Sequence, residues 1–240
     1  MTHRYNAHGQ PIGAALDDWI APTDLTALRI TGRYCALEPL DADRHGQALF
    51  NAWGAGDDEP SWTYLAYGPF AYAANYRRWI TEALSEPDSA YMAIIDRRHN
   101  AALGVCGYLN MRSADGVVEI GHIHYADALK GTRAATEAQY RLMQQAFGSG
   151  YRRYEWKCDA LNAASRRAAE RLGFMFEGIF RQHRVYNGRN RDTAWFSIID
   201  TEWPALDAAY RTWLAPDNFD DIGQQKQTLS ELTASARQTV

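Results

Sequence analysis

The segment 162–174 constrains the fold of this 240-residue chain more than any other. Asn162 can accept hydrogen bonds from the first N–H groups of a helix, so it marks a helix start. Apolar residues then recur at helical spacing, at Ala164, Ala168 and Leu172. Gly173 stands where a helix favours a left-handed residue at its end. Because Phe174 then opens an apolar run, the sequence predicts a short capped helix followed by a strand.

Strand-like and helix-like patterns alternate along the rest of the chain. Strands are expected at 28–37, 91–95, 103–111, 117–125, 153–160, 177–186 and 192–199. Helices are expected at 41–53, 71–84, 132–147 and 204–214, besides the one that begins at Asn162. This order predicts a single α/β domain over 28–214. Asn187 and Gly188 predict a hairpin turn, which 189–191 are expected to lengthen into a loop.

The two ends of the chain differ from this domain in composition. Residues 1–27 combine proline and glycine with scattered polar residues, and they are expected to form an arm that wraps the domain. Residues 215–240 are polar and predict a loose tail, with a short helix near Leu229 and Leu232. The sequence therefore predicts an arm, one domain and a tail.

The charge and the cysteines exclude several classes of protein. A formal net charge of −4 argues against a nucleic-acid-binding surface spread over the whole chain. Cys35, Cys106 and Cys158 are odd in number and form no Cys-x-x-Cys motif, so neither a disulfide framework nor a zinc site is expected. The N-terminus lacks the apolar core of a signal peptide, and no apolar run is long enough to span a membrane. We therefore expect a cytoplasmic protein with neither nucleic acid nor membrane as partner.

A strand, a turn and a helix start follow one another at 117–136. The N-terminus of a helix attracts anions, and Gly131 allows the backbone to approach one closely. Lys130 and Arg133 add positive charge. The pattern favours an anion site, although an ordinary strand–loop–helix connection has the same appearance.

The segment 162–174 resembles the coenzyme A-facing helix of the GNAT superfamily, the acetyl-CoA-dependent N-acetyltransferases. Its Asn-x-x-Ser opening and Leu-Gly-Phe close are most similar to the ribosomal-protein N-terminal acetyltransferase (RimJ/RimL-like) branch. The order of elements is similar as well, over roughly 28–206. The resemblance implies a GNAT-like α/β fold: a mixed, mainly antiparallel sheet with helices on both faces. Two strands would splay around the cofactor cleft, near 123–125 and 156–158.

The resemblance also implies that acetyl-CoA is the co-substrate, with its pyrophosphate on the loop before the helix at 132–147. Gly131 matches the first glycine of the GNAT loop, whereas Arg133 stands where a second glycine or an alanine is usual. An arginine there has less conformational freedom, and it places a guanidinium beside the phosphates. The implied cofactor-binding residues are Ile123, His124, Tyr125, Lys130, Gly131, Thr132, Arg133, Ala134 and Asn162.

The implied reaction is direct attack of a substrate amine on the acetyl thioester in a ternary complex. The amine must be neutral, so a group has to accept its proton. Glu119 is the first candidate for this base, directly or through water, although a strand glutamate is often only a solvated surface residue. His122 and His124 are the second, because imidazole titrates near neutrality. Their spacing also suits a metal, but no third ligand follows at a matching distance, so no metal is expected.

The departing thiolate needs a proton too. Many GNAT enzymes supply it from a tyrosine in the helix at 162–174, and Ala169 occupies that position here. Ser165 lies one helical turn earlier on the same face, and the resemblance implies that it hydrogen-bonds the leaving sulfur. The alternative is an ordinary first-turn serine that satisfies a backbone N–H.

Carboxylates followed by aromatic residues stand between the first two helices. They are Asp57, Asp58, Glu59, Trp62, Tyr64, Tyr67, Phe70 and Tyr72. This composition can receive a cationic amine, and it is equally typical of an acidic surface loop before helix-packing aromatics. Trp195 and Phe196 are both expected in the core.

Two functions remain open at this stage. The first is an N-acetyltransferase for the primary amine of a peptide N-terminus or a small molecule, acting as a monomer or homodimer. The second is a non-catalytic acyl-CoA-binding regulatory domain on the same fold, since fold alone does not settle function.

Overall fold

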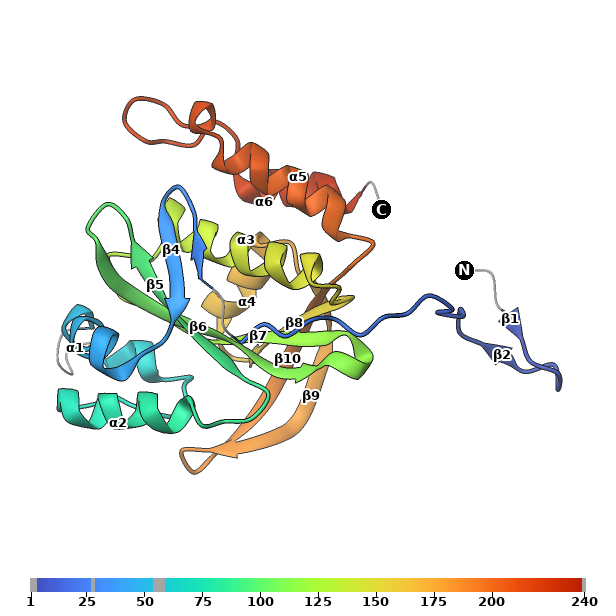
Figure 1. Cartoon of the computed structure of the whole chain (residues 1–240), viewed down its shortest axis with the longest axis horizontal. Coiled ribbons are helices and arrows are strands. Elements are labelled where there is room, and N and C mark those ends of the chain that lie inside the picture. The colour runs from blue at the N-terminus through green and yellow to red at the C-terminus, as the bar shows by residue number, and fades with distance from the viewer. Residues whose placement is uncertain (1–3, 27–28, 54–58, 239–240) are drawn as a thin grey trace.

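The computed structural model describes residues 4–26, 29–53 and 59–238 (Figure 1). The main body is built on an eight-stranded sheet in the order β3-β4-β5-β6-β7-β8-β10-β9. β7 and β8 run parallel, and the other neighbouring strands run antiparallel, which agrees with the mixed, mainly antiparallel sheet that the resemblance implies. The strands are Ile30–Thr31 (β3), Cys35–Pro39 (β4), Ala90–Asp96 (β5), Ala101–Arg112 (β6), Val117–Tyr125 (β7), Arg153–Asp159 (β8), Met175–Tyr186 (β9) and Arg189–Ile199 (β10).

Helices cover both faces of the sheet, so each face has its own buried core (Figure 1). One face carries α1 and α2, whose aromatic side chains pack on β5, β6 and β7. The other face carries α3 and α4, with α5 and α6 outside them. The helices are Ala42–Ala52 (α1), Ala73–Ala83 (α2), Arg133–Gly148 (α3), Ala163–Arg171 (α4), Trp203–Leu214 (α5) and Leu229–Arg237 (α6).

Both predicted ends of α4 are confirmed. The Asn162 side chain accepts a hydrogen bond from the Ser165 N–H at 3.0 Å. At the other end Gly173 has a φ of +95°, and the Phe174 N–H donates to the Ala169 carbonyl, as in a Schellman cap. The predicted apolar stripe is confirmed at Leu172, which is buried, and at Ala168, which packs partly buried against the core. It is wrong at Ala164, which is exposed, and it missed Ala169, which is fully buried.

The first predicted strand, 28–37, is wrong as one element. The chain forms the short strands β3 and β4, with a turn between them that includes Gly32. Glu137 of α3 holds this turn by accepting the backbone N–H groups of Arg33, Tyr34 and Cys35. Because Glu137 lies about a hundred residues away, no local signal marks the turn.

The β9–β10 hairpin turns more tightly than expected. Asn187 and Gly188 both have positive φ values, 50° and 68°, which suits the twist of a two-residue hairpin turn. Residues 189–191 pair with 184–186, so the longer loop predicted there is wrong.

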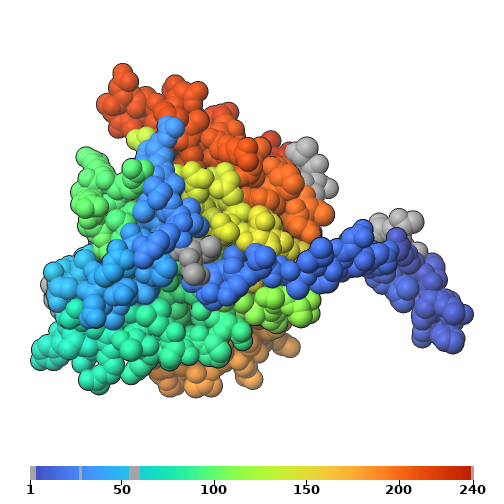
Figure 2. Space-filling view, viewed as in Figure 1, coloured from blue at the N-terminus to red at the C-terminus, as the bar shows by residue number. Residues whose placement is uncertain are grey.

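The two ends of the chain behave differently from each other. The first part, with β1 (Arg4–Tyr5) and β2 (Pro11–Ile12), projects away from the body (Figures 1 and 2). Only the later part of the arm wraps the domain, where Leu25 is fully buried. At the other end, the short helix predicted near Leu229 is present as α6. It packs against α5 with Leu229 fully buried, so this part of the tail is not loose.

Candidate active site

The parallel strands β7 and β8 part in the middle of the sheet. Their register runs from Val117 opposite Arg153 to Ile120 opposite Trp156. β7 then continues to Tyr125 without a strand partner on that side among the described residues, whereas β8 stays paired with β10 as far as Asp159. The predicted splay of these two strands is therefore confirmed.

A β-bulge lies on β7 where the strands part. Gly121 is opposite Gly107 and His124 is opposite Val105, so β7 carries one residue more than β6 between these pairs. His122 takes up the extra length with a φ of +48°. The bulge interrupts the alternation of the strand, so that Glu119, His122 and His124 lie on the face that carries α1 and α2.

The loop before α3 offers unpaired backbone donors. Gly131 has a φ of +72°, with no atom within 4 Å of the place that a β-carbon would take. The Thr132 side chain caps the Ala135 N–H at 3.2 Å. Within the described part of the chain, no partner is recorded for the N–H groups of Gly131, Arg133 and Ala134. Three free N–H groups at a helix start form a suitable place for an anion.

The two cations of this loop are already engaged by protein groups. Lys130 Nζ lies 2.7 Å from Asp127 Oδ1. The Arg133 guanidinium lies 4.1 Å from the ring centre of Phe219 and 5.2 Å from that of Tyr34. Arg133 therefore ties α3 to the segment before α6 and to the β3–β4 turn, which its position in the sequence did not reveal.

The last residues of β7 direct their side chains away from the parting. Tyr125 accepts a hydrogen bond from Gln139 of α3, and Ile123 packs against the same core. His124 points to the opposite face, where its ring lies 4.1 Å from that of Trp62 and its Nε2 lies 3.0 Å from Ser61 Oγ. We infer that these residues would meet a ligand through their backbone.

Glu119 is buried in a charged network, so its interpretation as a solvated surface residue is wrong. The residue is 7% exposed, and its Oε2 accepts from Asn110 Nδ2 at 2.6 Å and from Lys157 Nζ at 2.8 Å. Lys157 also lies 3.0 Å from Glu155. Sequence reasoning missed Lys157, although Glu155 and Lys157 share one face of β8 with Glu119 beside them.

His122 is half-buried beside Tyr67. Its Nδ1 lies 3.0 Å from the Tyr67 hydroxyl, and the two rings are stacked. Burial lowers the pKa of His122, and the charges of Glu86 and Glu119 oppose this effect. A neutral imidazole at physiological pH can accept a proton, so His122 is chemically suited to be a base.

Ser165 lies in the first turn of α4 beneath the parting of the strands. Its Oγ accepts a hydrogen bond from Trp156 Nε1 at 3.0 Å, so it does not act merely as a backbone cap. Burial raises the pKa of the neighbouring Cys158 thiol, and a hydrogen bond with Ser165 opposes that rise. Because the indole N–H occupies an acceptor site of Oγ, Ser165 acts as a donor through its hydroxyl proton, here toward the Cys158 sulfur.

The aromatic residues after the acidic loop are mainly structural. Trp62, Tyr67 and Phe70 form edge and stacked contacts with one another and with α1 and α2, as the helix-packing interpretation expects. Tyr64 differs, since its hydroxyl donates to the Leu161 carbonyl at 3.3 Å and spans toward the β8–α4 connection. Asp57, Asp58 and the Glu59 side chain lie outside the described residues.

Phe196 is fully buried as predicted, but Trp195 is not part of the core. Neighbouring residues of a strand point to opposite faces, and the face of Trp195 carries no covering helix at β10. Its ring lies under Lys157 Nζ at 3.9 Å and beside Phe180 at 4.6 Å.

The described residues give no sign of a metal centre or a membrane span. No three His, Cys, Asp or Glu side chains among them are placed to hold a metal ion. None of the helices in those ranges is long and apolar enough to cross a membrane. Cys35, Cys106 and Cys158 are buried free thiols.

The chain is similar to acetyltransferases in both sequence and fold. The family profile described as Acetyltransferase (GNAT) domain matches residues 35–175. A GCN5-related N-acetyltransferase from Brucella melitensis is 47% identical, with a TM-score of 0.88 over 91% of this chain and 100% of that one. A protein described as a probable GNAT-family acetyltransferase from Chromobacterium violaceum ATCC 12472 is 42% identical, with a TM-score of 0.77 over 82% of this chain and 98% of that one. The "Putative ribosomal N-acetyltransferase YdaF" of Bacillus subtilis (strain 168) is 29% identical over 175 residues, which are 70% of this chain and 90% of that protein.

These findings define the class of the protein as an acetyl-CoA-dependent acyltransferase, in whose fold the strands β7 and β8 part. Since the family profile covers more than half of its length, the chain belongs to the GNAT acetyltransferase family. It is an N-acetyltransferase by family. Its similarity to the putative ribosomal N-acetyltransferase of Bacillus subtilis supports the RimJ/RimL-like branch, which the segment 162–174 predicted.

Proposed function

We propose that the protein transfers the acetyl group of acetyl-CoA to a primary amine, either a peptide N-terminus or a small-molecule amine. The observation that carries this proposal is the parting of β7 and β8 beyond Ile120, with the free N–H groups of the α3 start beside it. The free thiols suit the cytoplasm, where disulfides are rare.

The N–H groups of Gly131, Arg133 and Ala134 are proposed to hold the cofactor pyrophosphate. The acetyl thioester then lies between the ends of β7 and β8. A backbone N–H of 123–125 donates to the carbonyl oxygen, where negative charge develops as the amine attacks. Thr132 and Asn162 support this site as helix caps.

The bond changes assign a role to three side chains. The amine nitrogen forms a bond to the acetyl carbon, the carbon–sulfur bond breaks, and one proton must leave the nitrogen while another reaches the sulfur. Glu119 is the proposed base through its Oε1, directly or through water, and His122 is the second candidate. Ser165 is proposed to donate its hydroxyl proton to the departing sulfur and to recover a proton from water.

The experiment is acetyl-CoA turnover against a panel of peptide N-termini and small amines, with calorimetry of acetyl-CoA binding. Gly131→Asp and Gly131→Asn form a matched pair, since asparagine tolerates the positive φ and differs from aspartate mainly in charge. The aspartate should weaken acetyl-CoA binding at least tenfold more than the asparagine does. If both variants bound acetyl-CoA with equal affinity, the assignment of the pyrophosphate site to this loop would be refuted. Tight binding by the wild type without turnover on any amine would favour the regulatory alternative.

A further inference from the structure

The β9–β10 hairpin carries an unusual row of positive charge. Arg184 and Arg191 are direct partners in the antiparallel register, and Arg189 follows opposite Tyr186. Like charges directly opposite each other on one face destabilise a sheet. We call Arg184, Arg189 and Arg191 the arginine row.

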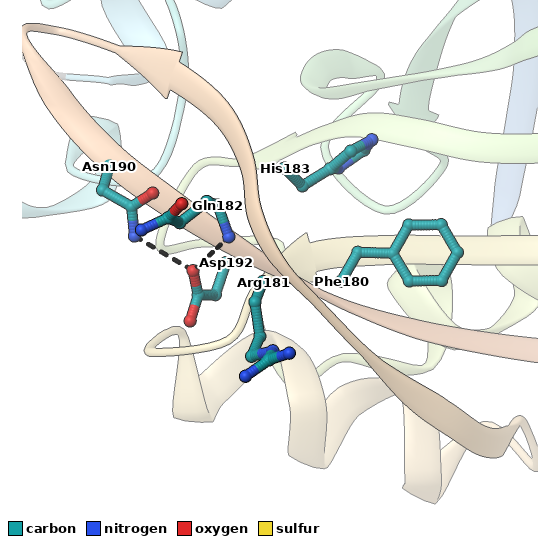
Figure 3. Close-up of a pocket in the computed structure, with 6 residues that line it drawn as sticks. All are labelled: Phe180, Arg181, Gln182, His183, Asn190 and Asp192. Carbon is teal, nitrogen blue, oxygen red and sulfur yellow. Dashed lines mark hydrogen bonds between the residues drawn. The ribbon is translucent and has the colours of Figure 1, made fainter.

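Within 29–53 and 60–238, whose ion pairs the structure describes, the arginine row has no carboxylate partner. Among the described residues, none of its three members forms an ion pair. Asp192 is held elsewhere, since it accepts from the Gln182 N–H at 2.7 Å and from Asn190 at 3.0 Å in the pocket drawn in Figure 3. Burial lowers the pKa of His183, and the charges of Arg184 and Arg191 lower it further. In a chain of net charge −4, this is a local concentration of positive charge.

The arginine row lies on the same face of the sheet as the proposed base Glu119, and we call this face the acceptor side. The register places Arg184 and Arg191 on the face of Thr193, which is opposite Asp159 at the end of β8. Tyr186 is on this face too, and its hydroxyl donates to Asp159 at 2.8 Å. Lys157 and Glu119 belong to the same face.

The spacing along the strands sets the size of a suitable ligand. Trp156 and Asp159 are three steps apart along β8, and Thr193 and Arg191 are two steps apart along β10. At about 3.3 Å per residue, these five backbone steps span about 16 Å, or about five residues of extended peptide. Arg191 Nε donates to Thr193 Oγ1 at 3.2 Å, so this guanidinium lies only about 10 Å along the strands from Trp156, or about three residues.

We propose that the arginine row binds carboxylates of a polypeptide acceptor, about three to six residues after its reacting amine. This inference rests on the proposed function, whose substrate class it narrows to proteins or peptides with an acidic N-terminal segment. The planar guanidinium fork matches a carboxylate in geometry as well as charge.

Arg181 provides a matched control within the same hairpin. Figure 3 shows Arg181 and His183 pointing to opposite sides of β9, with a bulge at Gln182 between them. Arg181→Gln therefore removes one positive charge from the hairpin without touching the acceptor side.

The test uses two peptides with a C-terminal fluorophore, Ser-Ala-Ala-Glu-Glu-Glu-Ala and Ser-Ala-Ala-Gln-Gln-Gln-Ala. Binding to the full chain with coenzyme A is measured by anisotropy, and acetylation is measured by mass spectrometry. The glutamate peptide should bind about tenfold more tightly, the effect of one charge-assisted hydrogen bond. The double variant Arg184→Gln, Arg191→Gln should abolish this preference, which Arg181→Gln should retain. The double variant should also melt no lower than the wild type, because it relieves a like-charge pair.

Each outcome decides one of the two proposals. The proposal for the arginine row would be overturned if the wild type bound the two peptides equally. It would also be overturned if Arg181→Gln and the double variant lost the preference for the glutamate peptide to the same extent. Stronger competition by a ten-nucleotide RNA than by the glutamate peptide would overturn it too, and would indicate a nucleic acid site. If the glutamate peptide binds with the expected arginine dependence and remains unacetylated, the arginine row stands and the proposed function fails.

Discussion

Glu137 is the side chain on which the β3–β4 turn depends. It is 2% exposed, and its carboxylate accepts three backbone N–H groups, from Arg33 at 2.8 Å, Tyr34 at 2.6 Å and Cys35 at 3.0 Å. A β-carbon at Gly32 would collide with this carboxylate. The turn is therefore built directly around one buried charge from α3.

The cost of losing this charge follows from the three bonds. Glu137→Ala leaves three N–H groups without an acceptor, at about 1–3 kcal/mol for each that stays dry. Two of these groups are only part-buried and can recruit water, so we expect a total loss of about 4 kcal/mol. Glu137→Gln keeps one oxygen for Tyr34 and Cys35, and it loses the Arg33 bond and the charge, so we expect about 2 kcal/mol.

Urea unfolding at pH 7 measures both free energies by linear extrapolation. Glu170→Gln makes the same charge change on the exposed side of α4, and it should shift the free energy of unfolding by less than about 0.5 kcal/mol. If Glu137→Gln and Glu170→Gln differed by less than that, the turn would not depend on the carboxylate and our reasoning would be wrong.

Two further predictions concern the site, and a third concerns His122 together with His45, a buried residue of α1. Glu119→Gln should lower the turnover rate by about 10²–10⁴ with little change in acetyl-CoA affinity, as calorimetry and steady-state kinetics can show. Ser165→Ala should reduce kcat more than acetyl-CoA affinity, and an unchanged kcat would end its assignment as the acid. Burial lowers the pKa of His45 and His122, so the unfolded chain binds more protons than the folded one below the ordinary value of about 6.5. The free energy of unfolding should therefore fall as the pH drops from about 6.5 through the folded pKa. Urea unfolding of His122→Asn at several pH values should show a weaker dependence of that free energy on pH.

The parts of the fold that could be predicted are those with local signals. Asn162 and Gly173 mark the ends of α4 through their own side chain or backbone, so their positions in the sequence were enough. The face that α4 buries could not be placed to the residue, because Ala164 and Ala169 are both small and apolar. The surrounding sheet and helices decide which of them is covered.

The parts that could not be predicted depend on distant residues. The turn at Gly32 is set by Glu137, and the partner of Glu119 is Lys157 on another strand. The alternation of β7 predicted that His122 and His124 share a face, but not that a bulge puts Glu119 on that face as well. A single added residue reverses the alternation, and no turn residue announces it.

Three energetically unfavourable arrangements lie on one face of the sheet. His122 holds a positive φ inside a strand, Glu119 and Glu155 are side by side in register, and Arg184 faces Arg191. Lys157 compensates the two glutamates from between them, whereas Arg184 and Arg191 form no ion pair among the described residues. Sequences contain such arrangements mainly at functional sites, where a ligand can supply the missing partner. An acceptor with a cationic or neutral amine at one end and carboxylates a few residues later would approach the β7–β8 parting and the arginine row together, which is why we place the acceptor on this face.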